Sequence, residues 1–277
     1  ENLYQKLVTE LEKLHNNKLR IPSGIRYKSG DFKHQGEAVD AWEKNANKGI
    51  LEIATGGGKT ITSLIAASKK LFSVKKALIL ISVPTKPLVD QWITDVVEFG
   101  IDPYISKAGT TSDIVQKINQ LRRYHNSQSG HEVIILTHNA LKDERVIKAL
   151  NKYNEKIFLI ADEVHNLAVN LFMDGDTGYF DFVIGLSATP EKQYDPDKSA
   201  KLFRLIGPVV YRFTLEEAIG KCLVPFCYQP VFVYLNDEEE DEWLELTERI
   251  RQLQFLVDSA DSSTLDLLKI RRSAIVE

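Results

Sequence analysis

Short runs of consecutive apolar residues alternate along the chain with longer segments in which apolar residues recur every three or four positions. The first pattern is typical of a strand buried on both faces of a sheet, and the second of a helix with one buried face. Strands are predicted at 50–54, 77–83, 133–137, 157–161 and 182–186, and helices at 34–46, 59–67, 84–96, 113–124 and 140–150. Strands and helices in this alternation predict an α/β fold with a parallel sheet.

The pattern changes on both sides of this region. Apolar residues at helical spacing precede it at 7–14, and residues 1–5 resemble the remnant of a protease-cleavable tag. After residue 190 the pattern predicts helices at 198–206, 214–220, 243–256 and 264–275, with extended segments at 209–213 and 228–235. We therefore divide the chain into an N-terminal helical segment at 1–30, an α/β domain at 31–213, and a connector with a helical extension at 214–277.

A glycine-rich loop joins the first predicted strand to the helix after it. Its residues are Thr55, Gly56, Gly57, Gly58, Lys59 and Thr60. Glycines let backbone amides approach an anion closely, and the N-terminus of a helix favours negative charge. Lys59 would place its ammonium on the β- and γ-phosphates of ATP, and the Thr60 hydroxyl would ligate Mg²⁺. Ile53 occupies the first glycine position of the G-x-x-x-x-G-K-T pattern, and a glycine-rich turn with a solvated lysine is the structural alternative.

An acidic pair, Asp162 and Glu163, follows the strand predicted at 157–161. Carboxylates at the end of a buried strand are costly unless a cation or a catalytic role requires them. Asp162 would hold Mg²⁺ directly or through a water, and Glu163 would position and polarise the water that attacks the γ-phosphate. Taken alone, the pair is equally typical of a helix cap.

Composition narrows the class of protein. The 277 residues are 43% hydrophobic and 27% charged, as in globular proteins, and no apolar run is long enough for a membrane span. We expect no membrane partner and a cytoplasmic, intracellular location. Cys222 and Cys227 are the only cysteines, which predicts buried free thiols rather than a disulfide framework or a zinc site.

Charge is distributed unevenly along the chain. Residues 236–261 carry ten carboxylates and two arginines, a local charge of −8 that leaves +4 on the remainder of a chain whose net charge is −4. A mildly basic body is compatible with binding a polyanion. The acidic run is equally typical of a solvated helix face.

Together these motifs resemble those of superfamily 2 helicases and translocases of the DEAD/DEAH group. Residues 56–60 resemble motif I, and residues 162–165 resemble motif II in its D-E-x-H form, with His165 at the end. Ser187 and Thr189 bound a Ser-Ala-Thr sequence that resembles motif III, which couples ATP turnover to nucleic acid in this group. Gln35 lies where the group has its adenine-reading glutamine, and a solvated glutamine is the alternative.

Further motifs of the group contact nucleic acid. Thr85 and Lys86 resemble part of motif Ia, and Thr137 and His138 resemble a second strand-contacting motif. Hydroxyls and helix N-termini suit contacts with a phosphate backbone, although helix caps explain each residue equally well.

The resemblance implies an ATP-dependent helicase or double-strand DNA translocase, with ATP and Mg²⁺ as cofactors and DNA favoured over RNA. Within the group, the chain most resembles the DNA translocase modules of restriction, defence or repair enzymes. Members have a second RecA-like domain that supplies arginine fingers, and nothing after Thr189 repeats such a domain, so we expect this chain alone to be nearly inactive. A nucleotide-sensing adaptor without turnover is the alternative. A third possibility is a P-loop kinase or a metabolic NTPase. It is disfavoured, because the presence of Gln35 and of the Ser-Ala-Thr sequence would then be coincidental.

Overall fold

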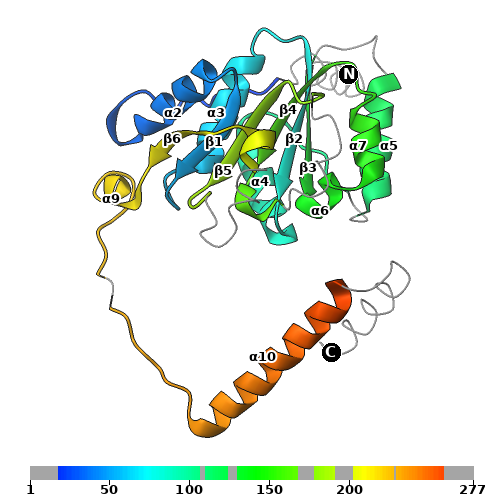
Figure 1. The fold of residues 1–277 in the computed structure, drawn as a ribbon. Helices are drawn as coiled ribbons and strands as arrows, with labels where there is room; N and C mark the ends of the chain where they lie inside the picture. The colour runs from blue at the N-terminus through cyan, green and yellow to red at the C-terminus, as the bar shows by residue number, and fades with distance from the viewer. Residues whose placement is uncertain are drawn as a thin grey trace, which may run out of the picture. The chain divides into compact units, whose positions relative to one another are not determined.

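The buried strands form a parallel sheet. Among the described residues, six strands lie in the order β3-β2-β4-β5-β1-β6, and every pairing between them is parallel (Figure 1). Their bounds are β1 Lys48–Ile53, β2 Lys76–Val83, β3 Gly130–Thr137, β4 Lys156–Ala161, β5 Phe182–Ser187 and β6 Val209–Phe213. The predicted α/β class and all five predicted strands are confirmed, and the extended segment predicted at 209–213 is the edge strand β6.

The computed structural model describes residues 18–106, 110–123, 130–167, 178–190, 202–227 and 229–258. The chain divides into two units, Glu1–Pro225 with the sheet and Phe226–Glu277 with helix α10, Asp237–Asp258. This division falls later than the boundary predicted at 213. The helices predicted at 7–14 and 264–275 lie outside the described residues, and none of the described helices is both long and apolar enough to cross a membrane.

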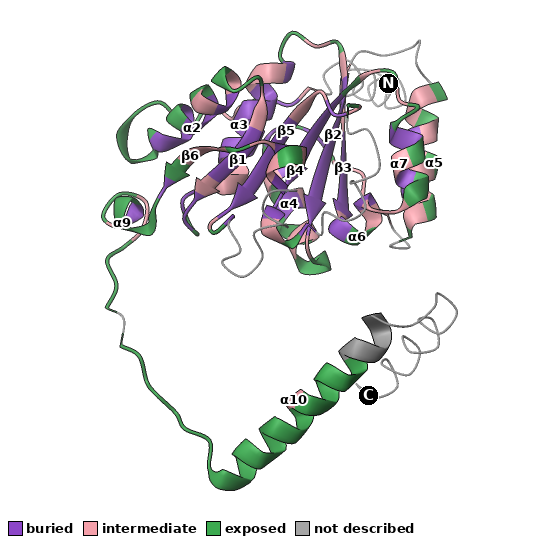
Figure 2. Ribbon diagram, in the orientation of Figure 1, coloured by how far each residue is buried: buried purple, intermediate pink, exposed green. Residues whose placement is uncertain are grey.

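Helices cover both faces of the sheet because successive residues of each buried strand point to opposite sides. Leu51 packs in a core with α2 His34–Lys44, α3 Lys59–Leu71 and α4 Lys86–Glu98. Its neighbour Ile50 packs in the opposite core. That second core contains α5 Thr111–Arg123, α6 His138–Leu141, α7 Glu144–Leu150 and the helical residues 202–206. Figure 2 shows the buried strands between these helical layers.

Three short helices complete the described secondary structure. They are the 3₁₀ turns η1 Gly30–Phe32 and η2 Val164–Asn166, and the single-turn helix α9 Leu215–Ala218. In α9 the Thr214 hydroxyl accepts from the Glu217 amide, and the Glu217 carboxylate accepts from the Thr214 amide. This capping box ends β6 and turns the chain away from the sheet.

Two predictions about local structure are wrong. The helix predicted at 140–150 is two helices, α6 and α7, because Asp143 has an extended backbone and caps α7. The extended segment predicted at 228–235 forms no strand among its described residues, and its apolar side chains are exposed. The two cysteines are free, but Cys222 is only half-buried and Cys227 is exposed.

Parallel strands bring all of their carboxyl ends to one edge of the sheet. The segments that begin at this edge are the glycine loop after β1, Thr85 after β2, His138 after β3, Asp162 after β4 and Thr189 after β5. In the strand order, β4, β5 and β1 are consecutive neighbours. Motif residues from distant parts of the chain therefore meet at the middle of this edge.

Candidate active site

The glycine loop has a backbone that only glycine adopts easily. Gly56 and Gly58 have φ angles of 82° and 83°, in the left-handed region. A Cβ on Gly57 would lie 2.6 Å from Ile53 Cγ2, and one on Gly58 would lie 2.5 Å from Gln35 Nε2. Gly58 is also the N-cap of α3. The loop thus leads straight into a helix N-terminus, with Lys59 and Thr60 in its first turn.

The start of α2 packs against this loop. His34 Nε2 donates to the Gly57 carbonyl oxygen at 2.7 Å, and its ring stacks on Phe213 with centroids 3.9 Å apart and planes 2° from parallel. Gln35 is 4% exposed, so the alternative of a solvated glutamine is wrong. Its amide lies directly beside Gly58. Sequence reasoning missed His34, although its position next to Gln35 was the available signal.

Lys59 and Glu163 face each other across the site. The Lys59 ammonium lies 3.7 Å from Glu163 Oε1 and donates to the Ile53 carbonyl oxygen at 3.4 Å. The Lys59 side chain is only 11% exposed. Glu163 has φ 41° and ψ 54°, a left-handed conformation that is uncommon outside glycine and costs about 1–3 kcal/mol. The structure thus places the loop lysine beside the acidic pair.

Asp162 is held by three separate contacts. Its backbone amide donates to the Ser82 carbonyl oxygen at 2.8 Å. Its Oδ1 accepts from the Glu163 amide at 2.9 Å, and its Oδ2 accepts from Trp92 Nε1 at 2.8 Å. Asp162 is 7% exposed. In the sequence, Trp92 follows the residues that resemble motif Ia and is one of the apolar residues of its helix, and neither feature indicates this bond.

A hydrogen-bond chain joins the acidic pair to the end of β5. Ser187 Oγ accepts from the Thr189 amide at 3.0 Å and lies within hydrogen-bond distance of His165 Nδ1, at 2.9 Å. The same ring nitrogen lies 3.5 Å from Glu163 Oε2. Of the predicted coupling residues, His165, Ser187 and Thr189 are therefore in direct contact.

His138 does not fit its predicted role as a strand-contacting residue. The side chain is buried, 3% exposed, and Nδ1 lies 2.7 Å from Ser82 Oγ. Burial lowers the pKa of His138 to about 4, so the ring is neutral at physiological pH. Its place beneath the surface indicates a structural contact with β2. Thr137 Oγ1 caps α6 by accepting from the Ala140 amide at 3.3 Å, as the structural alternative predicted.

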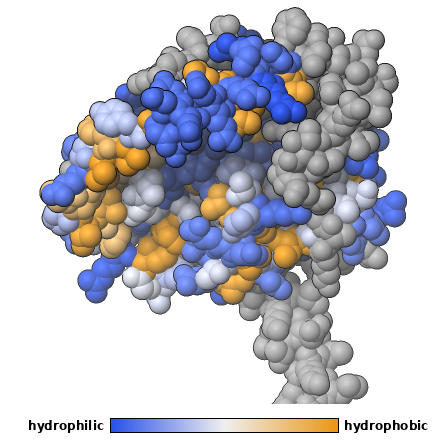
Figure 3. Space-filling model, turned by 90° about the horizontal axis from the view of Figure 1, so that it is seen from below, coloured by the Kyte–Doolittle hydropathy of each residue, from blue (hydrophilic) through white to orange (hydrophobic). Residues whose placement is uncertain are grey.

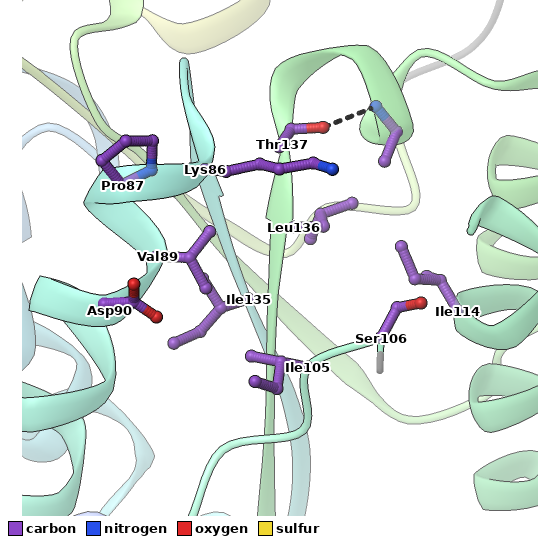
Figure 4. A pocket seen from close by; sticks show the side chains of 11 residues that line it. Lys86, Pro87, Val89, Asp90, Ile105, Ser106, Ile114, Ile135, Leu136 and Thr137 are labelled. Atoms are coloured by element: carbon purple, nitrogen blue, oxygen red, sulfur yellow. Dashed lines mark hydrogen bonds between the residues drawn. The ribbon is translucent and has the colours of Figure 1, made fainter. Parts of the chain in front are cut away.

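A pocket of about 530 Å³ opens beside the ends of β2 and β3 (Figure 4). Lys86 and Thr137 line it on the same side, and Thr85 precedes Lys86 as the N-cap of α4. The other lining residues are Pro87, Val89, Asp90, Ile105, Ser106, Ile114, Ile135, Leu136 and Ala140. Hydrophilic and hydrophobic residues are interspersed on the lower face of the molecule (Figure 3). The lining of the pocket combines apolar side chains with four polar or charged residues, Lys86, Asp90, Ser106 and Thr137.

A model of the family described as "Type III restriction enzyme, res subunit" (ResIII) matches residues 29–192, more than half of the chain. The chain belongs to this family. The ResIII match begins before Gln35 and ends just after Thr189, so it includes every motif described above.

One curated relative of this ResIII chain is the DNA 3'-5' translocase XPB2 of Sulfurisphaera tokodaii. The two are 30% identical over 220 residues, which are 79% of this chain and 44% of the relative. The chain thus spans less than half the length of the curated relative it matches.

One solved structure supports the fold. The ATP-dependent Type ISP restriction-modification enzyme LlaBIII bound to DNA has a TM-score of 0.50 and 17% identity, over 71% of this chain and 16% of its own. The UvsW helicase from bacteriophage T4 has a TM-score of 0.48 and 17% identity, over 72% and 65%. The predicted resemblance is confirmed: the sheet and its helices are a RecA-like domain of a superfamily 2 helicase or translocase.

Proposed function

We propose that this chain is the ATP-binding domain of an ATP-dependent DNA helicase or double-strand DNA translocase, which acts with a second RecA-like domain. The observation that carries the proposal is the convergence of Lys59, Asp162 and Glu163. The ammonium and the Glu163 carboxylate lie 3.7 Å apart, although they are over 100 residues apart in sequence. A lysine, a metal-ligating carboxylate and a second carboxylate are the groups that phosphoryl transfer to water requires.

Each residue would have one task when ATP is bound. The amides of the glycine loop and the first turn of α3 would cradle the phosphates, and Lys59 would neutralise the β- and γ-phosphates. The Gln35 amide, beside Gly58, would hydrogen-bond the adenine edge, to which it can both donate and accept.

The donor set of the site fits Mg²⁺. Within the part of the chain that the structure describes, no three His, Cys, Asp or Glu side chains cluster as a complete metal site. Mg²⁺ in nucleotide sites needs only one or two carboxylates, because phosphates and waters complete its octahedron. Asp162 and the Thr60 hydroxyl would hold the ion, which supplies charge neutralisation of the phosphates. Glu163 would orient the attacking water and accept its proton.

DNA is the proposed nucleic-acid partner. Lys86 and Thr137 line the pocket beside β2 and β3, and Thr85 directly precedes Lys86 as the N-cap of α4, so we assign these residues to contacts with phosphates. XPB2 is named as a DNA translocase, and LlaBIII was solved with DNA bound. These relatives favour DNA over RNA. The series of hydrogen bonds from Thr189 through Ser187 to His165 would carry the effect of bound DNA to Glu163.

Nucleotide binding by the chain tests the proposal. Lys59→Ala should remove most of the affinity for ADP and for a non-hydrolysable ATP analogue in isothermal titration calorimetry, because the ammonium would contact phosphate rather than the core. The melting temperature without nucleotide should change little. Lys156→Ala is the matched control, since Lys156 also pairs with a carboxylate, Asp181, but begins β4 at the opposite edge. Equal affinity in both variants would refute the phosphate-loop assignment.

A further inference from the structure

The indole of Trp92 is the side-chain donor that fixes Asp162. We propose that Trp92 is a positioning residue for the metal site, and that it makes the metal-binding geometry of Asp162 depend on the position of helix α4. This inference rests on the proposed function, because it assigns Asp162 to Mg²⁺.

The bond is well suited to fixing a carboxylate. Trp92 Nε1 lies 2.8 Å from Asp162 Oδ2, and Trp92 and Asp162 are 1% and 7% exposed. An indole nitrogen is a donor only, so it requires an acceptor at this place. A carboxylate has about four lone-pair positions, and the Trp92 and Glu163 N–H groups each use one. Both oxygens are oriented while the remaining lone pairs stay available for a cation.

Helix α4 connects Asp162 with the pocket proposed to bind DNA. Asp162 receives its two long-range contacts from one continuous segment, β2–α4: the Ser82 carbonyl holds its backbone, and Trp92 holds its side chain. The same helix begins with Lys86, six residues before Trp92 and about 9 Å along the axis. Lys86 lines the pocket proposed to bind DNA. A displacement of α4 at its first turn would therefore move the donor that orients Asp162.

A second tryptophan provides a matched control. Trp42 Nε1 donates to the Val183 carbonyl oxygen, also at 2.8 Å, and Trp42 is 0% exposed. Trp42 and Trp92 thus each have a buried indole with a hydrogen bond of the same length. They differ in the acceptor. Trp42 donates to the backbone of Val183, which lies near the end of β5 opposite to Ser187 and therefore away from the site.

The experiment measures how nucleotide affinity depends on metal. The affinity of the chain for a non-hydrolysable ATP analogue is determined by calorimetry in Mg²⁺ and in EDTA, for the wild type, Trp92→Phe and Trp42→Phe. In Trp92→Phe, the factor by which Mg²⁺ raises the affinity for the analogue should be about tenfold smaller than in the wild type. This is the lower end of the usual effect of losing a residue that hydrogen-bonds a metal ligand. Its affinity in EDTA, and both affinities of Trp42→Phe, should match the wild type.

Trp92→His separates the hydrogen bond from packing. Indole Nε1 and imidazole Nε2 are each separated from Cβ by two ring carbons. Imidazole Nε2 can therefore occupy the position of indole Nε1 and keep a donor there. Trp92→His removes the six-membered ring from the core and should lower the melting temperature more than Trp92→Phe. The metal dependence should nevertheless stay closer to the wild type. Binding of Mn²⁺ to the ADP-loaded chain, followed by electron paramagnetic resonance, should rank the variants in the same order.

The possible results are distinct. If the wild type binds the analogue with Mg²⁺ but Trp92→Phe behaves like Trp42→Phe, the positioning role is wrong and the proposed function stands. If Trp92→Phe loses affinity equally in Mg²⁺ and in EDTA, its effect is structural and the inference is also wrong. If the wild type binds no nucleotide under either condition, the proposed function fails, and the inference fails with it.

Discussion

At the scale of single residues, the site concentrates costly features where chemistry is proposed. Glu163 has a left-handed backbone, and only 11% of the Lys59 side chain is exposed. Such features persist only when the surrounding contacts over-determine them. Here the Glu163 amide donates to Asp162 Oδ1, and the Glu163 carboxylate forms an ion pair with the Lys59 ammonium. The backbone strain of Glu163 thus serves to aim its carboxylate into the site.

Glu163→Gln tests the role of this carboxylate. Glutamine keeps the size and hydrogen bonds but loses the charge that polarises water. In a longer protein that includes a second RecA-like domain, ATP hydrolysis should fall about 10²-fold or more, while Mg²⁺-dependent ATP binding persists. Glu52→Gln, which changes a β1 carboxylate paired with Arg212, serves as the control. Hydrolysis that survives Glu163→Gln and also Asp162→Asn would remove both residues from the mechanism.

His131 should make stability depend on pH. Its Nδ1 accepts from the Leu19 amide at 3.2 Å, and burial lowers the pKa of this imidazole below its usual 6.5. In the unfolded chain His131 takes up a proton near pH 6.5, whereas the folded chain stays neutral to lower pH. The stabilisation is therefore complete above about pH 6.5 and is lost as the pH falls through that value towards the lowered pKa.

The variant His131→Asn isolates this effect. Asparagine can still accept from the Leu19 amide but does not titrate. Thermal melts at pH 7.5 and 5.5 should show a smaller loss on acidification for the variant than for the wild type. An identical loss in both proteins would assign the acid sensitivity to other groups, among them the buried His138.

Local sequence was enough to find the residues whose role depends on their own backbone or immediate neighbours. Gly56 and Gly58 are examples, because left-handed φ angles select glycine directly. The contacts of Trp92 and His34 could not be found in this way. Their partners, Asp162 and Gly57, are 70 and 23 residues away, and only the folded sheet brings them together.

At the scale of whole elements, periodicity predicted which segments are helices and strands but not where a helix breaks. The interval at 140–150 keeps its apolar spacing through Leu141, Val146 and Leu150, so it was predicted as one helix. Instead α6 ends at Leu141 with Lys142 as its C-cap, and Asp143 starts α7, with its carboxylate accepting from the Arg145 amide at 2.9 Å. Capping competes with helix continuation, and hydrophobic periodicity does not report it.

Asp143→Ala should reduce the free energy of unfolding by about 1 kcal/mol, the usual cost of losing an N-cap. Asp143→Asn should retain most of it, since asparagine caps equally well. Glu144→Ala removes only the exposed pair with Lys148 and should cost less than about 0.5 kcal/mol. Urea melts of the three variants measure these differences. Equal effects of Asp143→Ala and Glu144→Ala would mean that α7 does not depend on its cap.

At the scale of the molecule, the proposed function makes this site one half of an active centre. Superfamily 2 enzymes complete it with arginines from a second RecA-like domain, and such a finger is worth roughly 10³–10⁵ in turnover. We expect the 277-residue chain to bind ATP, to hydrolyse it feebly and to unwind nothing. A longer protein with the second domain should hydrolyse ATP faster by orders of magnitude, and more so with DNA.

Steady-state hydrolysis with and without DNA measures this difference. A nucleotide-sensing adaptor would show no stimulation in the longer protein. Vigorous DNA-stimulated hydrolysis by residues 1–277 alone, at a rate linear in protein concentration, would contradict the two-domain proposal.

The order of strands in the sheet also has a consequence for synthesis on the ribosome. Strand β1 pairs only with β5 and β6 among the described strands, and both are made more than 100 residues later. At 5–20 residues per second, β1 spends on the order of ten seconds without a partner on either edge. Its unpaired amides and carbonyls are a template for wrong pairing throughout that time. The glycine loop, fixed at the end of β1, is therefore translated well before β5 and β6 but takes its final place only after they have been made.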